Sequence, residues 1–415
     1  MKRILLIGLI VLVFSWCLIP VEAKTKEEIY QDKLTQLKPK DTKRHYALGL
    51  WCVKNKLPEQ AEIQFKKVIE LKPNHSGARK RLGYIKIKDQ WMSPEEITAQ
   101  GWIKHKGKWI TKKEKVRLEA IKKLGTYKGV LEKPGADKEN LPWERARTKE
   151  TEHFIVKTNL SVNALNDICF LMECVYLTWQ DFFGFSEPEK KPNVSVTKNK
   201  VDFKKVYRTL LGDDPSPIRG KFIAEESPGN KSHENHLLTY YYRIDKMTTP
   251  NTLIHEGLHY VLKLVVSGQS IPPMWLNEGL ATYFGSSKVK GKKLVTNLVN
   301  PRWLPQAKKI INDKTCINLK DFINLSQSEF GINLDYYAEG WSLVYFLFNG
   351  QNGKYEQGFQ SYIEAWKKGK IVTVINNGNL ELQDKVAHLK LFEECMGVPM
   401  DQLEEEWKEY ILKLK

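Results

Sequence analysis

Residues 249–285 read TPNTLIHEGLHYVLKLVVSGQSIPPMWLNEGLATYFG, and this stretch decides how the chain is interpreted. Thr249–Pro250 predicts the start of a helix, with the threonine as N-cap and the proline in the first turn. His255 and His259 are four positions apart, so both imidazoles lie on one face of that helix. They can bind the same cation, whereas Glu256 is offset and faces a metal-bound water.

A metal site of this kind needs a third protein ligand and an open position for water. The segment that follows offers a candidate, because Pro272–Pro273 can begin a second helix and Gly285 can end it. Glu278 lies in the middle of this predicted helix, nineteen positions after His259. That spacing lets the first helix finish, a loop turn back and the second helix direct a carboxylate at the same ion.

HEGLH, followed after eighteen residues by the glutamate of WLNEGLATYF, resembles the gluzincin metallopeptidases of the peptidase MA-like clan, specifically the aminopeptidase N branch. The resemblance is close over residues 249–285 and loose over about 150–350. It implies a zincin-like catalytic domain in which His255, His259 and Glu278 bind one zinc ion. It also implies that the chain is an enzyme that hydrolyses peptide bonds, with the glutamate of HEGLH, Glu256, as general base.

The family also uses a tyrosine about sixty residues after the third ligand, in a Y-x-x-G setting. Residues 337–340 read YAEG at that distance, so Tyr337 is the implied donor to the oxyanion, with Tyr336 as the alternative. One departure concerns substrate choice. Aminopeptidases of this branch carry a G-A-M-E-N segment whose glutamate binds the substrate's amino group, and residues 220–242 contain no match. Endopeptidase and exopeptidase activity therefore both stay open.

Two repeats precede this region. Residues 42–75 have the spacing of a tetratricopeptide helix-turn-helix, and Pro73 ends the second helix. A single repeat must pack on a neighbour, so it is either structural or a docking surface for a protein partner. The second repeat has a period of 18 residues, with residues 83–93 echoed at 101–111, and each copy predicts a small hairpin followed by a helix N-cap. The positions that carry the first pattern are Leu48, Gly49, Ala61, Phe65 and Pro73.

The first residues have the layout of a secretory signal: two cations, an apolar run over 4–19 and a small-residue ending at Ala23. We therefore expect an exported protein, located in the periplasm, in the cell envelope or outside the cell, although an uncleaved anchor is the alternative. The predicted segments are a signal peptide at 1–23, a helical region at 24–82, hairpin repeats at 83–124, a linker at 125–150 and the catalytic domain at 151–415.

The net charge of +17 is spread along the chain, and no Arg-rich or aromatic nucleic-acid motif accompanies it. We therefore expect no nucleic acid partner; an anionic envelope surface fits this charge, and so does simple solubility.

The residue patterns predict an α+β fold dominated by helices, with a small sheet. Strands are expected at 154–156, 193–196 and 237–244, and a long helix over 164–183 ends at Gly184. The strand at 237–244 could pair with an extended substrate. Three functions fit: a zinc peptidase acting on peptides or proteins, a non-catalytic zinc-bearing scaffold of the envelope, and a zinc hydrolase of a non-peptide amide.

Overall fold

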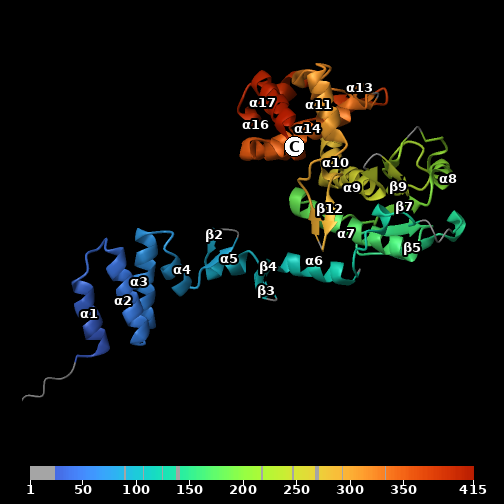
Figure 1. The fold of residues 1–415 in the computed structure, drawn as a ribbon. Helices are drawn as coiled ribbons and strands as arrows, with labels where there is room; N and C mark the ends of the chain where they lie inside the picture. The colour runs from blue at the N-terminus through green and yellow to red at the C-terminus, as the bar shows by residue number, and fades with distance from the viewer. Residues whose placement is uncertain are drawn as a thin grey trace, which may run out of the picture. The chain divides into compact units, whose positions relative to one another are not determined.

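The computed structural model divides the chain into two compact units, Met1–Lys115 and Val116–Lys415 (Figure 1). The predicted class, α+β with helices dominant and small sheets, is confirmed. The predicted signal segment lies outside the described residues. Among the described helices, none is both long and apolar enough to cross a membrane. The structure describes residues 24–87, 90–105, 107–123, 125–136, 141–215, 218–244, 247–266, 271–291, 293–331 and 333–415.

The first unit begins with helices that pack around a small core. The predicted helical pair forms as α2 (Thr42–Lys54) and α3 (Pro58–Leu71). Gly49 permits their close approach, because a Cβ atom there would lie 2.6 Å from Cε1 of Phe65. The two helices therefore meet through the small and aromatic positions that the sequence pattern singled out. The flanking helices are α1 (Lys26–Thr35) and α4 (Ser76–Arg81).

Both predicted hairpins are present and each is followed by a helix. Ser93 caps the first of these helices through a reciprocal pair of hydrogen bonds with Glu96, and Thr111 accepts a 3.0 Å hydrogen bond from the amide of Glu114 at the second. Both caps agree with the sequence interpretation. The elements are β1 (Ile85–Ile87), β2 (Gln90–Met92), α5 (Pro94–Ala99), β3 (Trp102–His105), β4 (Lys108–Thr111) and α6 (Lys112–Lys123).

A five-stranded sheet organises the second unit, in the order β5-β6-β7-β9-β8. β6, β7 and β9 are parallel, whereas β5 and β8 run antiparallel at the two edges. The strand expected at 237–244 is shorter and interior: β9 ends at Tyr240 and pairs on both sides, so it has no free edge for a substrate. The strands are β5 (Arg147–Glu150), β6 (Ile155–Thr158), β7 (Asn193–Thr197), β8 (Gly220–Ile223) and β9 (His236–Tyr240).

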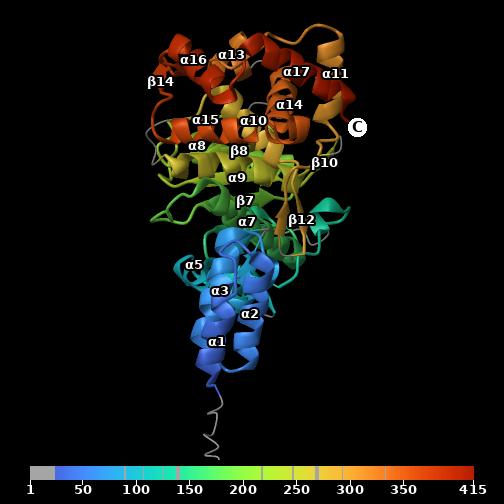
Figure 2. The same cartoon turned by 90° about the vertical axis from the view of Figure 1, so that its left-hand side faces the viewer.

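Helices cover both faces of this sheet (Figures 1 and 2). α7 (Val162–Phe183) and α9 (Thr249–Val265) share a core with Leu237, whereas α8 (Lys200–Leu211) packs on the opposite face against Leu238. Consecutive residues of β9 thus serve two cores, which explains its unbroken run of buried side chains. Most residues of α7 are buried, and the helix ends at Gly184, as predicted, where the glycine is left-handed.

The interpretation of residues 125–150 as a linker is wrong for much of the described segment. Residues 147–150 form β5, and the side chain of Leu131 is fully buried in the main core. The buried carboxylate of Asp167 on α7 accepts hydrogen bonds of 2.7 Å from the amides of Lys128 and Val130. These hydrogen bonds hold the segment against α7 within the second unit, although the composition of the segment is polar.

The C-terminal part is helical, and two of its helices cross at a pair of glycines. A Cβ atom on Gly279 of α10 (Met274–Phe284) would lie 3.0 Å from the carbonyl oxygen of Gly340 on α14 (Asp335–Asn349). Only glycine allows the two backbones to come so close. The remaining helices are α11 (Trp303–Asn312), α12 (Leu319–Phe322), α13 (Gln327–Gly331), α15 (Glu356–Lys367), α16 (Lys385–Met396) and α17 (Met400–Lys413).

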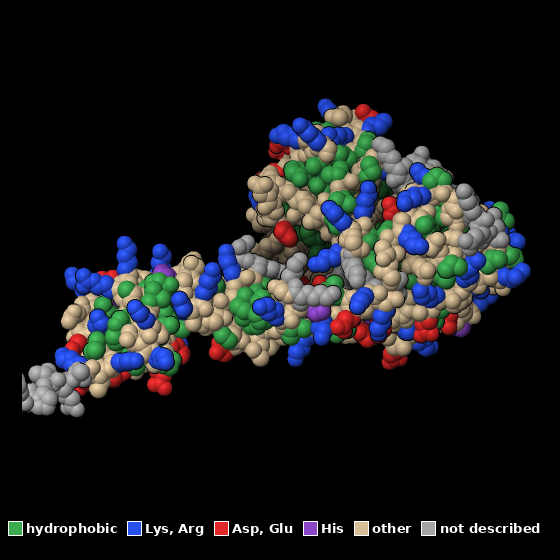
Figure 3. Space-filling view, turned by 60° about the horizontal axis from the view of Figure 1, so that its bottom comes forward, with side chains coloured by type: hydrophobic (Ala, Val, Ile, Leu, Met, Phe, Trp, Pro, Cys, Tyr) green, Lys and Arg blue, Asp and Glu red, His purple; other side chains and the backbone are tan. Residues whose placement is uncertain are grey.

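Among the described residues of the second unit there are also three small hairpins and three short 3₁₀ turns. The hairpins are β10 (Arg243–Ile244) with β11 (Met247–Thr248), β12 (Lys288–Lys290) with β13 (Lys293–Val295), and β14 (Thr373–Asn376) with β15 (Asn379–Leu382). The turns are η1 (Val130–Glu132), η2 (Trp143–Arg145) and η3 (Gly350–Asn352). Lys and Arg side chains are scattered over the visible face of both units in Figure 3, as the sequence indicated.

Glu339 on α14 is a buried carboxyl whose burial raises its pKa to about 8, although the Ile317 amide and the Cys316 thiol partly oppose the shift. The folded state therefore binds a proton that the unfolded state releases above pH 4.5, and stability falls as the pH rises from about 4.5 to about 8. Relative to wild type, Glu339→Gln is expected to gain about 2–4 kcal/mol between pH 5 and 8. Urea unfolding at pH 5 and pH 8 measures the free energy of unfolding of both proteins, with the exposed Glu405→Gln as control. A difference between Glu339→Gln and wild type that is the same at both pH values would contradict the prediction.

Candidate metal centre

α9 positions three of the residues singled out in the sequence. Its N-cap is Thr248, whose amide and hydroxyl both donate to Oδ1 of Asn251, at 3.0 and 2.9 Å. This is one residue earlier than predicted, because the hydroxyl of Thr249 instead accepts a 3.0 Å hydrogen bond from the amide of Tyr242. Pro250 lies in the first turn as expected. The helix then continues without interruption through the HEGLH segment.

The second predicted helix also forms and brings the third residue to the first two. α10 begins after Pro273 and ends at Gly285, and it carries Glu278 in its middle. Oε2 of Glu278 lies 3.3 Å from Nε2 of His255 and 3.7 Å from Nε2 of His259. The two Nε2 atoms are 3.2 Å apart. Among the described residues, these three form the group of His, Cys, Asp or Glu side chains that could hold a metal ion.

A hydrogen bond on the far side of His259 helps to explain why this cluster suits a cation. Nδ1 of His259 lies 2.8 Å from Oδ1 of Asn277. An amide oxygen accepts a hydrogen bond from a protonated Nδ1, which leaves Nε2 of His259 with a lone pair. This lone pair, Nε2 of His255 and a carboxylate oxygen of Glu278 lie within 3.7 Å of one another, an arrangement that a bound cation stabilises.

The charges within the cluster also favour a bound cation. Burial lowers the pKa of His255, but its hydrogen bond to Glu278 and the negative charge there outweigh this, so the pKa is raised overall. Burial raises the pKa of Glu278, but the charges of His259 and His255 outweigh it and the pKa falls. Without a cation, the carboxylate thus favours a proton on His255, and a bound metal would replace that proton.

Glu256 lies beside this cluster but outside it. Its Oε2 accepts a 2.8 Å hydrogen bond from the amide of Phe222 on β8. Gly220 lets this edge strand approach α9, because a Cβ atom there would lie 2.3 Å from Cγ2 of Thr252 and 3.1 Å from Cγ of Glu256. The sheet edge therefore holds the carboxylate in place next to the candidate metal ligands.

Tyr337 and Tyr336 have different surroundings. Tyr337 lines a cavity of about 1230 Å3 together with His255 and Glu256, and the charge of Glu278 raises its pKa. The crossing of α10 and α14 at their glycines brings it there. Tyr336 instead packs its ring against Phe322 and Phe330, and it does not line that cavity. The geometry thus separates two tyrosines that the sequence left as alternatives.

Sequence reasoning missed Asn277, although it immediately precedes the third ligand. An amide one residue before a metal-binding glutamate could have been read as a partner for a histidine, but only once both helices were known to face each other.

The partly buried His–His–Glu cluster beside a helix-covered mixed sheet places this chain among proteins with a potential metal centre. Within this chain, a family model described as "Protein of unknown function (DUF1570)" matches residues 250–367. The matched segment contains the three candidate ligands, Glu256 and Tyr337. No curated protein matches the chain.

Proposed function

We propose that this chain is a zinc-dependent metallopeptidase. The observation that carries the proposal is the cluster of His255, His259 and Glu278 with Glu256 on the same helix as both histidines. Two imidazoles and one carboxylate fit zinc, and a catalytic zinc site keeps a further position for water. When bound, zinc would lower the pKa of its water and polarise a substrate carbonyl.

Glu256 is the general base in this proposal. It accepts the proton of the attacking water and passes it to the leaving amine. Its hydrogen bond from the Phe222 amide supports this role, since it fixes the carboxylate without neutralising it. Tyr337 donates to the oxyanion that develops on the carbonyl, which its position in the same cavity as Glu256 supports.

The substrate backbone is proposed to pair with β8. Within the described sheet, β8 has β9 on one side and lies at the end of the strand order. It is also the strand that touches the general base, so a peptide added to it would pass the metal ligands. This edge replaces the strand at 237–244, which the sequence suggested for the same purpose.

The cellular setting is part of the proposal as well. The N-terminal layout supports export, and the helical pair α2–α3 is either structural or a docking surface for a protein partner. A zinc-bearing scaffold without turnover and a hydrolase of a non-peptide amide are the competing functions.

The test is metal content and turnover of purified residues 24–415. We expect about one zinc ion per chain by elemental analysis, cleavage of a peptide library, loss of cleavage after chelation and recovery when zinc is restored. Zinc without any cleavage would favour the scaffold or the non-peptide hydrolase. A chain that holds no metal would overturn the central claim.

A further inference from the structure

The charged side chains that line the cavity beside the candidate metal ligands are mainly cationic. Outside the metal centre and Glu256, its described lining contains four cations and one carboxylate, Glu132, which accepts a 2.8 Å hydrogen bond from the hydroxyl of Tyr127. Such a surplus of one sign in a concave site raises the local concentration of oppositely charged ligands. The four cations are Arg219, Arg243, Lys288 and Arg302.

Aromatic rings hold two of these arginines in place. The guanidinium of Arg219 lies 5.3 Å from the ring centre of Tyr242, and that of Arg302 lies 4.4 Å from the ring centre of Trp303. Trp303 in turn stacks on Tyr337 at 6.3 Å with an interplanar angle of 18°. Ring contacts of this kind hold a half-buried guanidinium, and so its positive charge, at the cavity wall.

Two buried hydroxyls of the same cavity point independently to a ligand. Thr282 and Ser287 both line it, with only 4% and 3% of their surface exposed. Within the described part of the chain, neither hydroxyl oxygen has a hydrogen-bond partner. Because buried polar atoms are nearly always hydrogen-bonded in proteins, these two hydroxyls mark polar groups of the cavity wall that the described residues leave unsatisfied.

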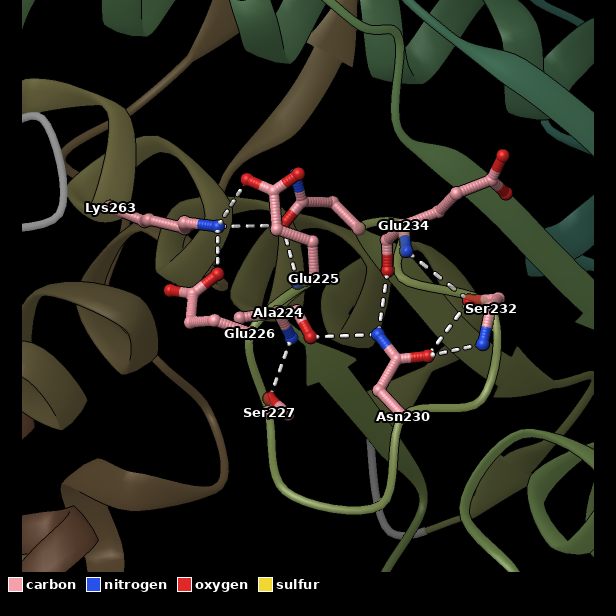
Figure 4. Close-up of polar contacts among 9 residues, drawn as sticks. Ala224, Glu225, Glu226, Ser227, Asn230, Ser232, Glu234 and Lys263 are labelled. Carbon is pink, nitrogen blue, oxygen red and sulfur yellow. Dashed lines mark hydrogen bonds and ion pairs between the residues drawn. The ribbon is translucent and has the colours of Figure 1, made fainter.

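Two neighbouring carboxylates, Glu225 and Glu226, lie at the opposite end of α9 and β8 around Lys263 (Figure 4). Lys263 lies one turn after the second histidine ligand, and its Nζ is 3.0 Å from Glu225 and 2.5 Å from Glu226. Lys263 lowers the pKa of Glu225, and its ammonium group is shared by two carboxylates. The cationic cavity instead adjoins Gly220 and Thr248, where β8 and α9 begin.

We propose that the cationic cavity selects peptides with a carboxylate, on a side chain or at the chain terminus, on the C-terminal side of the cleaved bond. This inference rests on the proposed peptidase function. The carboxylate is attracted to the cavity and the amino end of the peptide to the acidic end of the cleft. The peptide then runs antiparallel to β8, the direction of pairing that is slightly more stable per residue.

The experiment uses quenched fluorescent peptides of one sequence in matched forms. Glu or Gln stands on the C-terminal side of the cleaved bond, and the terminus is free or amidated. Wild type is expected to cleave each carboxylate form with about tenfold higher kcat/KM than its amide twin, and less so as salt is raised. In the Arg243→Gln/Lys288→Gln double variant this ratio is expected to fall to about 2 or less, whereas Arg145→Gln, an exposed control, keeps the wild-type ratio.

Binding of the same peptides to Glu256→Gln, measured by fluorescence anisotropy, separates this inference from the peptidase proposal. If the carboxylate forms bound more tightly but wild type cleaved no peptide, the peptidase proposal would be wrong and carboxylate recognition by the cavity would be supported. Preference for only the side-chain or only the terminal carboxylate supports the inference and identifies the source. Equal cleavage and equal binding of the twins would overturn it, as would a preference for carboxylates on the N-terminal side.

Discussion

Replacement of Glu256 by glutamine is expected to lower kcat/KM for peptide cleavage by about 10²–10⁴-fold while the chain keeps its metal. Glutamine has the same shape but cannot accept the proton of the attacking water. Its side-chain oxygen can still accept from the amide of Phe222, which lies 2.8 Å from Oε2 of the carboxylate, so the local structure is retained. The measurement combines steady-state kinetics with elemental analysis of the same preparation.

The matched control is Glu405→Gln, an exposed glutamate on α17 that changes the net charge by the same amount. It is expected to leave both turnover and metal content unchanged. If Glu256→Gln cleaved peptides within about threefold of wild type, another group would have to take the proton and the proposed mechanism would be wrong. If it lost its metal, the variant would report on the integrity of the site and not on proton transfer.

The local signals in the sequence predicted the two helices of the metal centre well. Pro250, Pro273 and Gly285 mark their ends, and these residues act through backbone geometry that a short segment already contains. The N-cap was misplaced by one residue because two adjacent threonines compete. The backbone amide of Tyr242, which lies outside the helix, donates a hydrogen bond to the hydroxyl of Thr249. Thr248 is therefore the N-cap.

Contacts between distant segments could not be predicted in this way. The residues of β9 favour a strand, but only its pairing with β7 and β8 shows that both its edges are used. The polar composition of residues 125–150 is typical of a linker. Only the structure shows that Asp167 on α7 accepts hydrogen bonds from two backbone amides of this segment. The Y-x-x-G setting favours Tyr337 over Tyr336 in the sequence, but only the crossing of α10 and α14 shows that the two side chains have different surroundings.

His259→Ala is expected to weaken zinc binding by about 10²–10³-fold or more, since it removes one of three protein ligands. Zinc is also expected to raise the melting temperature of wild type but not of this variant. A ligand stabilises the folded state in proportion to how tightly it binds that state, and the variant binds zinc weakly. Competition with a chelator of known affinity and thermal unfolding with and without zinc provide the two measurements. The exposed His233→Ala is the matched control and should behave as wild type.

Asn277→Ala provides a graded companion to the ligand variant. The amide oxygen of Asn277 lies 2.8 Å from Nδ1 of His259, so its loss frees the imidazole to change tautomer and orientation without removing a ligand. Such partners typically contribute 10–100-fold in metal affinity, and we expect a loss of about that size. The predicted order of affinity is therefore wild type, then Asn277→Ala, then His259→Ala. Wild-type affinity in His259→Ala would mean that the metal binds elsewhere, and the cluster on α9 and α10 would then be structural.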